Sequence, residues 1–184
     1  NLCPSDRIFL GHGERNRNMN PETTCCFTGP RSPRLPMNGN EFSAEIAALK
    51  VNIRKAVIEA YSEGFRFFMS GMAEGFDIFA AETVLELKKD FEGIALVAVL
   101  PYSGAPKSHS SGLNKRIADI LEKADSVISL SENYVPGCEH LRNKYMADNS
   151  TRIIGYYNGL SGGTAHCWNY AAEKNLELVN LYEN

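Results

Sequence analysis

A short glycine-rich segment near the end of the chain has residue types that can bind an anion. It reads Ser161-Gly162-Gly163-Thr164 and precedes an expected helix. Glycine amides and a helix N-terminus together attract phosphate groups, and Thr164 would cap the helix or bind a phosphate oxygen. The segment is neither a P-loop, because no lysine follows the glycines, nor a Gly-x-Gly-x-x-Gly fingerprint. Its spacing therefore fits phosphate or ribose binding and an ordinary strand-to-helix turn equally well.

A second segment has the same order of strand, glycines and helix, and reads Ser70-Gly71-Met72-Ala73-Glu74-Gly75. The acids Glu74 and Asp77 lie where this helix would begin. A carboxylate there either stabilises the helix N-terminus or holds sugar hydroxyls or a base. These two are also the acids best placed for catalysis. Glu82 follows Asp77 at a spacing of about 140° around a helix, so Asp77 and Glu82 are not expected to act as a pair.

Arginines supply the complementary positive charge. Arg31 and Arg34 follow the first expected strand, beyond Gly29, and two guanidinium groups of this kind suit a phosphate or a carboxylate. Solvated loop arginines are the alternative interpretation. Further candidates for stacking on a ligand or bonding to it lie on a later helix and just before it, at Tyr134, Arg142 and Asn143.

Metal and disulfide chemistry are not expected. Cys138, His140, His166 and Cys167 lack the usual spacing of zinc ligands, and we expect no metal site. The cysteines number five and include no Cys-x-x-Cys pair, which is untypical of a disulfide framework and favours the cytoplasm. The neighbours Cys25-Cys26 lie in an expected strand and should therefore face opposite sides of a sheet.

The apolar pattern that must position these residues alternates strands with helices. Expected strands cover 23–28, 65–70, 94–100, 126–130, 152–157 and 176–181, and expected helices cover 41–64, 76–90, 112–124, 138–149 and 164–174. Such alternation indicates an α/β fold, with a mostly parallel sheet of about six strands between two layers of helices. Ligands of such sheets bind beyond the carboxyl ends of the strands, where the strand order reverses. We therefore expect the glycine segments and the arginines to meet at that edge.

The overall charge limits the classes of partner. Lys and Arg total 19 and Asp and Glu total 22 among 184 residues, a net charge of −3. Non-specific binding of nucleic acid requires a basic face, so nucleic acid is not expected as a partner, whereas a small basic pocket for a phosphate-bearing metabolite is compatible with this charge. No apolar run approaches the roughly 18 residues of a membrane helix. Residues 1–22 are polar and aperiodic, and we expect them to be an extension of a domain covering 23–184, with the natural start near Met19.

Several motifs together resemble one known family, the YpsA-like branch of the SLOG superfamily. In chain order they are Cys25–Arg31, Ser70–Asp77, Ala80–Glu82, Arg142–Met146 and Gly162–Thr164. The superfamily also contains the DNA-processing protein DprA and the LONELY GUY enzymes. The resemblance covers roughly 23–181, and it implies a Rossmann-like fold with a pocket for a nucleotide or nucleotide-derived ligand. LONELY GUY enzymes hydrolyse the N-glycosidic bond of nucleoside monophosphates, whereas a sensor of nucleotide-like ligands has been proposed for the superfamily.

The chain also departs from these patterns at three places. Gly29-Pro30-Arg31-Ser32 replaces the Gly-His-Arg-Pro that is common in the branch, and 104–109 lacks the Gln and Trp often found there. The hydrolases carry Pro-Gly-Gly-x-Gly-Thr with a nearby glutamate, and the segment around Gly162 matches only part of that motif. This last departure disfavours a hydrolase, whereas the first two remove a histidine and the residues that would stack on a base.

The first hypothesis is therefore a bacterial module that binds or senses a nucleotide-like small molecule, with homo-oligomers as a further expectation. The predicted ligand-binding residues are Gly29, Arg31, Ser70, Gly71, Met72, Glu74, Gly75, Asp77, Tyr134, Arg142, Asn143, Gly162, Gly163 and Thr164. The alternatives are an N-glycosidic hydrolase that uses Glu74 or Asp77 and a DprA-like protein that binds single-stranded nucleic acid. No cofactor is firmly implied beyond the nucleotide-like ligand itself.

Overall fold

The computed structural model describes residues 9–11, 19–105 and 110–182, and it has the α/β architecture that the alternating pattern predicts. Its strands are β1 (Phe9–Gly11), β2 (Thr24–Thr28), β3 (Phe67–Ser70), β4 (Ala95–Leu100), β5 (Ser126–Ser129), β6 (Arg152–Gly155) and β7 (Glu177–Asn180). Its helices are α1 (Ala44–Ser62), α2 (Phe76–Leu87), α3 (Ser111–Lys123), α4 (Cys138–Asp148) and α5 (Gly163–Glu173). Each predicted strand and helix is present, and the observed ends lie up to three residues from the expected ones.

The strands form one sheet in the order β1-β5-β4-β3-β2-β6-β7. Strands β2 to β7 run parallel, which confirms the predicted sheet, and β1 pairs antiparallel with β5 at one edge. The sequence pattern does not predict β1, which falls inside the expected extension; the remaining residues of that extension before Met19, 1–8 and 12–18, lie outside the described ranges. Strand order reverses between β2 and β6, so this is the place where the fold predicts a ligand.

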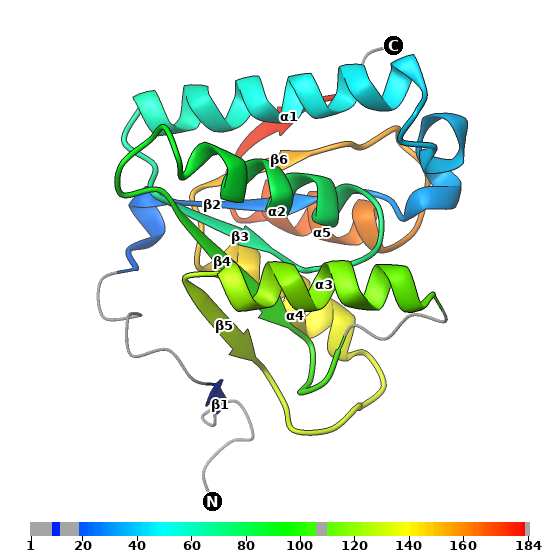
Figure 1. The fold of residues 1–184 in the computed structure, drawn as a ribbon. Helices are drawn as coiled ribbons and strands as arrows, with labels where there is room; N and C mark the ends of the chain where they lie inside the picture. The colour runs from blue at the N-terminus through cyan, green and yellow to red at the C-terminus, as the bar shows by residue number, and fades with distance from the viewer. Residues whose placement is uncertain (1–8, 12–18, 106–109, 183–184) are drawn as a thin grey trace, which may run out of the picture.

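Helices cover both faces of the sheet (Figure 1). Helices α1, α2 and α3 pack on one face and α4 and α5 on the other, and each face has its own buried apolar cluster. Cys25 lies in the first cluster and Cys26 in the second, so the two neighbours face opposite sides as predicted.

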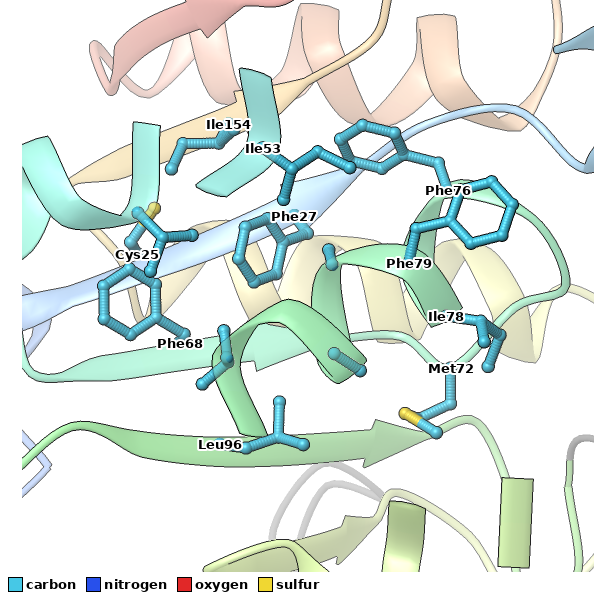
Figure 2. Close-up of a cluster of buried hydrophobic side chains, with 14 of the residues drawn as sticks. Cys25, Phe27, Ile53, Phe68, Met72, Phe76, Ile78, Phe79, Leu96 and Ile154 are labelled. Carbon is cyan, nitrogen blue, oxygen red and sulfur yellow. The ribbon is translucent and has the colours of Figure 1, made fainter. Parts of the chain in front are cut away.

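The larger cluster holds β2 and the start of α2 in place (Figure 2). The ring of Phe27 on β2 stacks on that of Phe68 on β3, with 6.1 Å between the centroids. Phe76, the first residue of α2, is fully buried, and a Cβ at Gly29 would overlap its side chain. The Phe76 amide also donates a hydrogen bond of 3.3 Å to the Pro30 carbonyl. The loop after β2 is thereby fixed against the N-terminus of α2.

Neither a metal-binding cluster nor a membrane-spanning helix is present in the part of the chain that the structure describes. Within it, no His, Cys, Asp or Glu side chains form a group of three or more that could hold a metal ion. None of the helices in the same ranges has the length and hydrophobicity that a bilayer span requires.

Candidate functional site

A cavity of about 630 Å³ lies at the carboxyl ends of β2, β3 and β6, beside the strand-order reversal. A volume of this size suits a small organic ligand. Several predicted ligand-binding residues from four separate segments line it together: Gly29, Arg31, Glu74, Asp77, Arg142, Asn143, Gly162, Gly163 and Thr164. The fold therefore brings the two glycine segments, the loop after β2 and helix α4 to one place.

Asp77, in the first turn of α2, places a buried carboxyl group in this cavity. The residue is 5% exposed, and its Oδ2 accepts a hydrogen bond of 3.3 Å from the Ala73 amide. Its Oδ1 is buried and has no hydrogen-bond partner among the described residues. Burial raises the pKa of Asp77 to about 6, and the guanidinium of Arg142, the Ala73 amide and Arg31 counteract that rise. A buried acceptor without a donor is costly, so Oδ1 is available to a ligand that brings one.

Arg142 on α4 is the buried cation of the site. The residue is 7% exposed; its Nη1 donates to the Gly71 carbonyl, and its Nε donates to Asn143 Oδ1 at 2.8 Å. A Cβ at Gly71 would overlap the guanidinium, so the glycine provides the room in which Arg142 lies. This arrangement joins the loop after β3 to α4, which packs on the opposite face of the sheet from α2.

Arg34 and Arg31 supply two more guanidinium groups from the loop after β2. Arg34 Nη1 donates to the Ser161 carbonyl at 2.7 Å, which fixes this side chain against the glycine segment before α5. Arg31 Nη2 donates to Glu139 Oε1 at 3.0 Å, and both of these side chains are well exposed. Three guanidinium groups therefore line one cavity, each with an acceptor on the protein.

The helix start at α5 differs from an ordinary capped one. Its N-cap residue is Gly162, so no side chain of the described residues caps the first turn. A Cβ added at Gly163 would meet no described atom within 4 Å, so the backbone there is open toward the cavity that it lines. Amides at an uncapped helix N-terminus favour an anion.

Five predicted residues do not line the cavity: Ser70, Gly71, Met72, Gly75 and Tyr134. Four of them shape its support. Ser70 Oγ donates to the Asp77 carbonyl at 2.9 Å and accepts from the Met72 amide at 3.2 Å. Gly75 has a φ of +95°, and a Cβ there would lie 2.7 Å from the Ser32 amide nitrogen. These contacts fix the turn that presents Asp77.

Tyr134 lies away from the cavity, on the loop after β5. It is 66% exposed, and its ring meets that of Tyr102 edge to face at a centroid distance of 5.8 Å. Because Tyr134 does not line the cavity, its position gives no support to the predicted stacking role, which stays a prediction.

Glu139 and His140 line the cavity although the sequence did not predict them as ligand-binding residues. Arg34 lines it too; the sequence marked it with Arg31 as suited to an anion, but it is absent from the predicted ligand-binding set. Only one feature of the sequence pointed to Glu139 and His140: they lie at the start of a helix that follows the carboxyl end of a strand. The His140 ring lies 4.4 Å from that of His166, whose pKa is lowered chiefly by burial and further by His140 and Lys144.

A family model named YpsA and described as the YspA SLOG family matches residues 25–182 of the chain. A UPF0398 protein of Halalkalibacterium halodurans is 26% identical over 131 residues, which cover 70% of this chain and 69% of that protein. The uncharacterized SPbeta prophage-derived protein YoqJ of Bacillus subtilis is 30% identical over 121 residues, covering 59% of this chain and 71% of YoqJ.

Two solved structures share the fold. DNA processing protein A from Helicobacter pylori, described for its single-stranded DNA binding mode, matches with a TM-score of 0.62 at 18% identity. That match covers 90% of this chain and 67% of the other. DprA from Streptococcus pneumoniae matches with a TM-score of 0.58 at 19% identity, covering 85% of this chain and 49% of the other. At these identities the likeness is one of fold alone.

Proposed function

We propose, from the premise that this chain belongs to the YspA SLOG family, that its cavity binds a nucleotide or nucleotide-derived ligand. The observation that carries the proposal is the unpaired Oδ1 of Asp77, buried inside a cavity that three guanidinium groups also line. Such a cavity offers an acceptor for hydroxyl or amine donors beside cations for an anionic group. A phosphorylated sugar carries both kinds of group.

The anionic end of the ligand is assigned to the start of α5. Gly162 and Gly163 line the cavity there without a capping side chain from the described residues. Arg34 reaches the same segment through the Ser161 carbonyl. Backbone amides, the helix dipole and a guanidinium group therefore act on one region, the arrangement that favours phosphate.

The sugar end of the ligand is assigned to Asp77. A ribose hydroxyl that donates to Oδ1 would give this atom the partner that the described protein does not provide. Since an unsatisfied buried acceptor costs about 1–3 kcal/mol, filling it contributes to binding selectively. The exposed carboxylate of Glu74 lines the same cavity and is a second candidate for the hydroxyls.

Thermal unfolding in the presence of nucleosides, nucleotides and inorganic phosphate tests this function. A ligand at about 100 times its Kd should stabilise the fold by about 2.7 kcal/mol, which raises the Tm of a chain of this size by roughly 5–10 °C. The Arg34→Ala variant should lose most of the shift, whereas Arg54→Ala on α1, outside the cavity, should keep it. Absence of any shift across the panel, with the fold intact, would refute the proposal.

A second function, N-glycosidic hydrolysis, is favoured by the pKa of Asp77. A carboxyl group whose pKa lies at about 6 is partly protonated near neutral pH, as general acid catalysis requires. Release of free base from nucleoside monophosphates tests it, measured with purified protein and with Asp77→Asn. Base release that the variant loses would favour an enzyme; binding without release would leave a ligand-binding module.

A further inference from the structure

Glu139 lines the cavity beside the arginines that would attract an anion. We propose that Glu139 is a specificity-determining residue, which forms an ion pair with Arg31 and discriminates against ligands that carry several negative charges. The inference rests on the proposed nucleotide-binding function and adds a property to it, the limit on ligand charge.

The ion pair between Arg31 and Glu139 joins two sides of the cavity. Arg31 follows β2, whereas Glu139 lies in the first turn of α4, and Arg31 Nη2 approaches Glu139 Oε1 to 3.0 Å. Their side chains are 62% and 59% exposed. An exposed pair of this kind is weak, so a ligand phosphate can take over the guanidinium. The carboxylate of Glu139 then remains close to the bound anion and repels each added negative charge.

The charged side chains that line the cavity balance one another in formal charge. The basic ones are Arg31, Arg34 and Arg142, and the acidic ones are Glu74, Asp77 and Glu139. No lysine of the described residues lines the cavity. Sites for polyphosphates instead place an excess of cations around the ligand. One phosphate can therefore bind a guanidinium group, whereas additional phosphates would have no unpaired cation to bind.

Among the three acids, Glu139 is the one whose removal breaks an ion pair with an arginine of the cavity without disturbing the support of the cavity. Asp77 is buried and bonded to the Ala73 amide. Glu74 has no ion pair with an arginine of the described cavity, so its removal frees no guanidinium group. The Glu139→Gln variant keeps the shape of the side chain, removes its charge and leaves Arg31 with at most a neutral amide acceptor in place of the ion pair.

Glutamate in the first turn of a helix also favours that helix electrostatically, and the experiment must separate this effect. Glu45 occupies the first turn of α1, is exposed and does not line the cavity. Glu45→Gln therefore removes the same charge from the same kind of position and is the matched control.

Calorimetric titration of AMP, ADP and ATP into the wild type, E139Q and E45Q tests the inference. We expect the wild type to bind AMP more tightly than ATP, and E139Q to reduce that preference by about fivefold, the order expected for an exposed ion pair. E45Q should keep the wild-type preference.

Two results would overturn the inference while leaving nucleotide binding intact. One is equal or tighter binding of ATP by the wild type, and the other is an unchanged preference in E139Q. Failure of all three proteins to bind AMP, ADP or ATP would overturn this inference, whereas the proposed function itself is overturned only by absence of any thermal shift across the wider panel of nucleosides, nucleotides and phosphate. Binding by E139Q alone would support the inference in its strongest form, because Glu139 would then be the group that excludes the ligand.

Discussion

Replacing Asp77 by asparagine removes a carboxylate that burial disfavours, and we expect Asp77→Asn to be more stable than the wild type at pH 7.5. The pKa of Asp77 rises from an ordinary 3.8 to about 6. A difference of about two pH units corresponds to about 3 kcal/mol of unfolding free energy at neutral pH. This figure already includes the attraction of Arg142 and Arg31, which lowers the pKa.

The net gain should be smaller than that limit. An asparagine oxygen can accept from the Ala73 amide in place of Oδ2, but its NH₂ group then lies where Oδ1 has no partner among the described residues. An unsatisfied buried donor costs about 1–3 kcal/mol. We therefore expect a gain of about 1 kcal/mol, or roughly 2–4 °C in Tm.

The pH dependence gives the sign of the effect. Because the folded state holds the Asp77 proton up to about pH 6 and the unfolded state loses it near 3.8, this group costs no stability below pH 3.8. Its cost develops as the pH rises between these two values and is complete above about pH 7. The advantage of Asp77→Asn over the wild type should therefore grow from pH 4 to pH 7 and then stay constant.

Urea unfolding of both proteins at pH values from 4 to 8 measures this difference. Asp119→Asn, on the exposed surface of α3, is the control for the change in net charge. An Asp77→Asn variant that becomes less stable relative to the wild type as the pH rises would refute the reasoning. It would show that Arg142 and Arg31 stabilise the carboxylate by more than burial destabilises it.

Three further predictions concern the glycines and nucleic acid. Gly29→Ala should lower the free energy of unfolding by about 1–3 kcal/mol in urea titrations, because the added Cβ overlaps the buried Phe76 side chain. Gly163→Ala should unfold within about 0.5 kcal/mol of the wild type, since the added methyl group meets no described atom, yet it should weaken nucleotide binding in calorimetry by occupying the cavity. Single-stranded DNA should not be retained in gel shifts at low salt; retention that weakens as salt is added would favour the DprA-like alternative.

The element order was predictable because long apolar runs alternate with amphipathic segments over almost all of the domain. The run at Ala95–Leu100 is buried almost throughout, as a strand covered on both faces must be. Strand β1 was not predictable, because three residues carry too little pattern and its assignment depends on pairing with the edge of β5.

The roles of the glycines were less predictable than their positions. Gly71 and Gly162 both lie between a strand and a helix, and both were predicted to bind the ligand. In the structure, the missing Cβ at Gly71 leaves room for Arg142, whereas Gly162 lines the cavity at the start of α5. A Cβ at Gly162 would also lie close to an arginine, 2.9 Å from Arg34 Nη1, and Gly162 has a φ of +140°. Both arginines are more than seventy positions away from the glycine that they approach, so the local sequence does not reveal these contacts.

The net charge of −3 left open whether arginines gather at the ligand edge, and the structure brings three of them there. It also brings three carboxylates to the same cavity, among them Glu139, which looks like an ordinary first-turn acid in the sequence. Under the proposed function, a balanced rather than basic lining would let a mildly acidic protein bind one anionic group without binding polyanions in general. The proposed recognition would then depend on local geometry: the unpaired Oδ1 of Asp77, the uncapped start of α5 and guanidinium groups that hydrogen bonds to the protein hold in place.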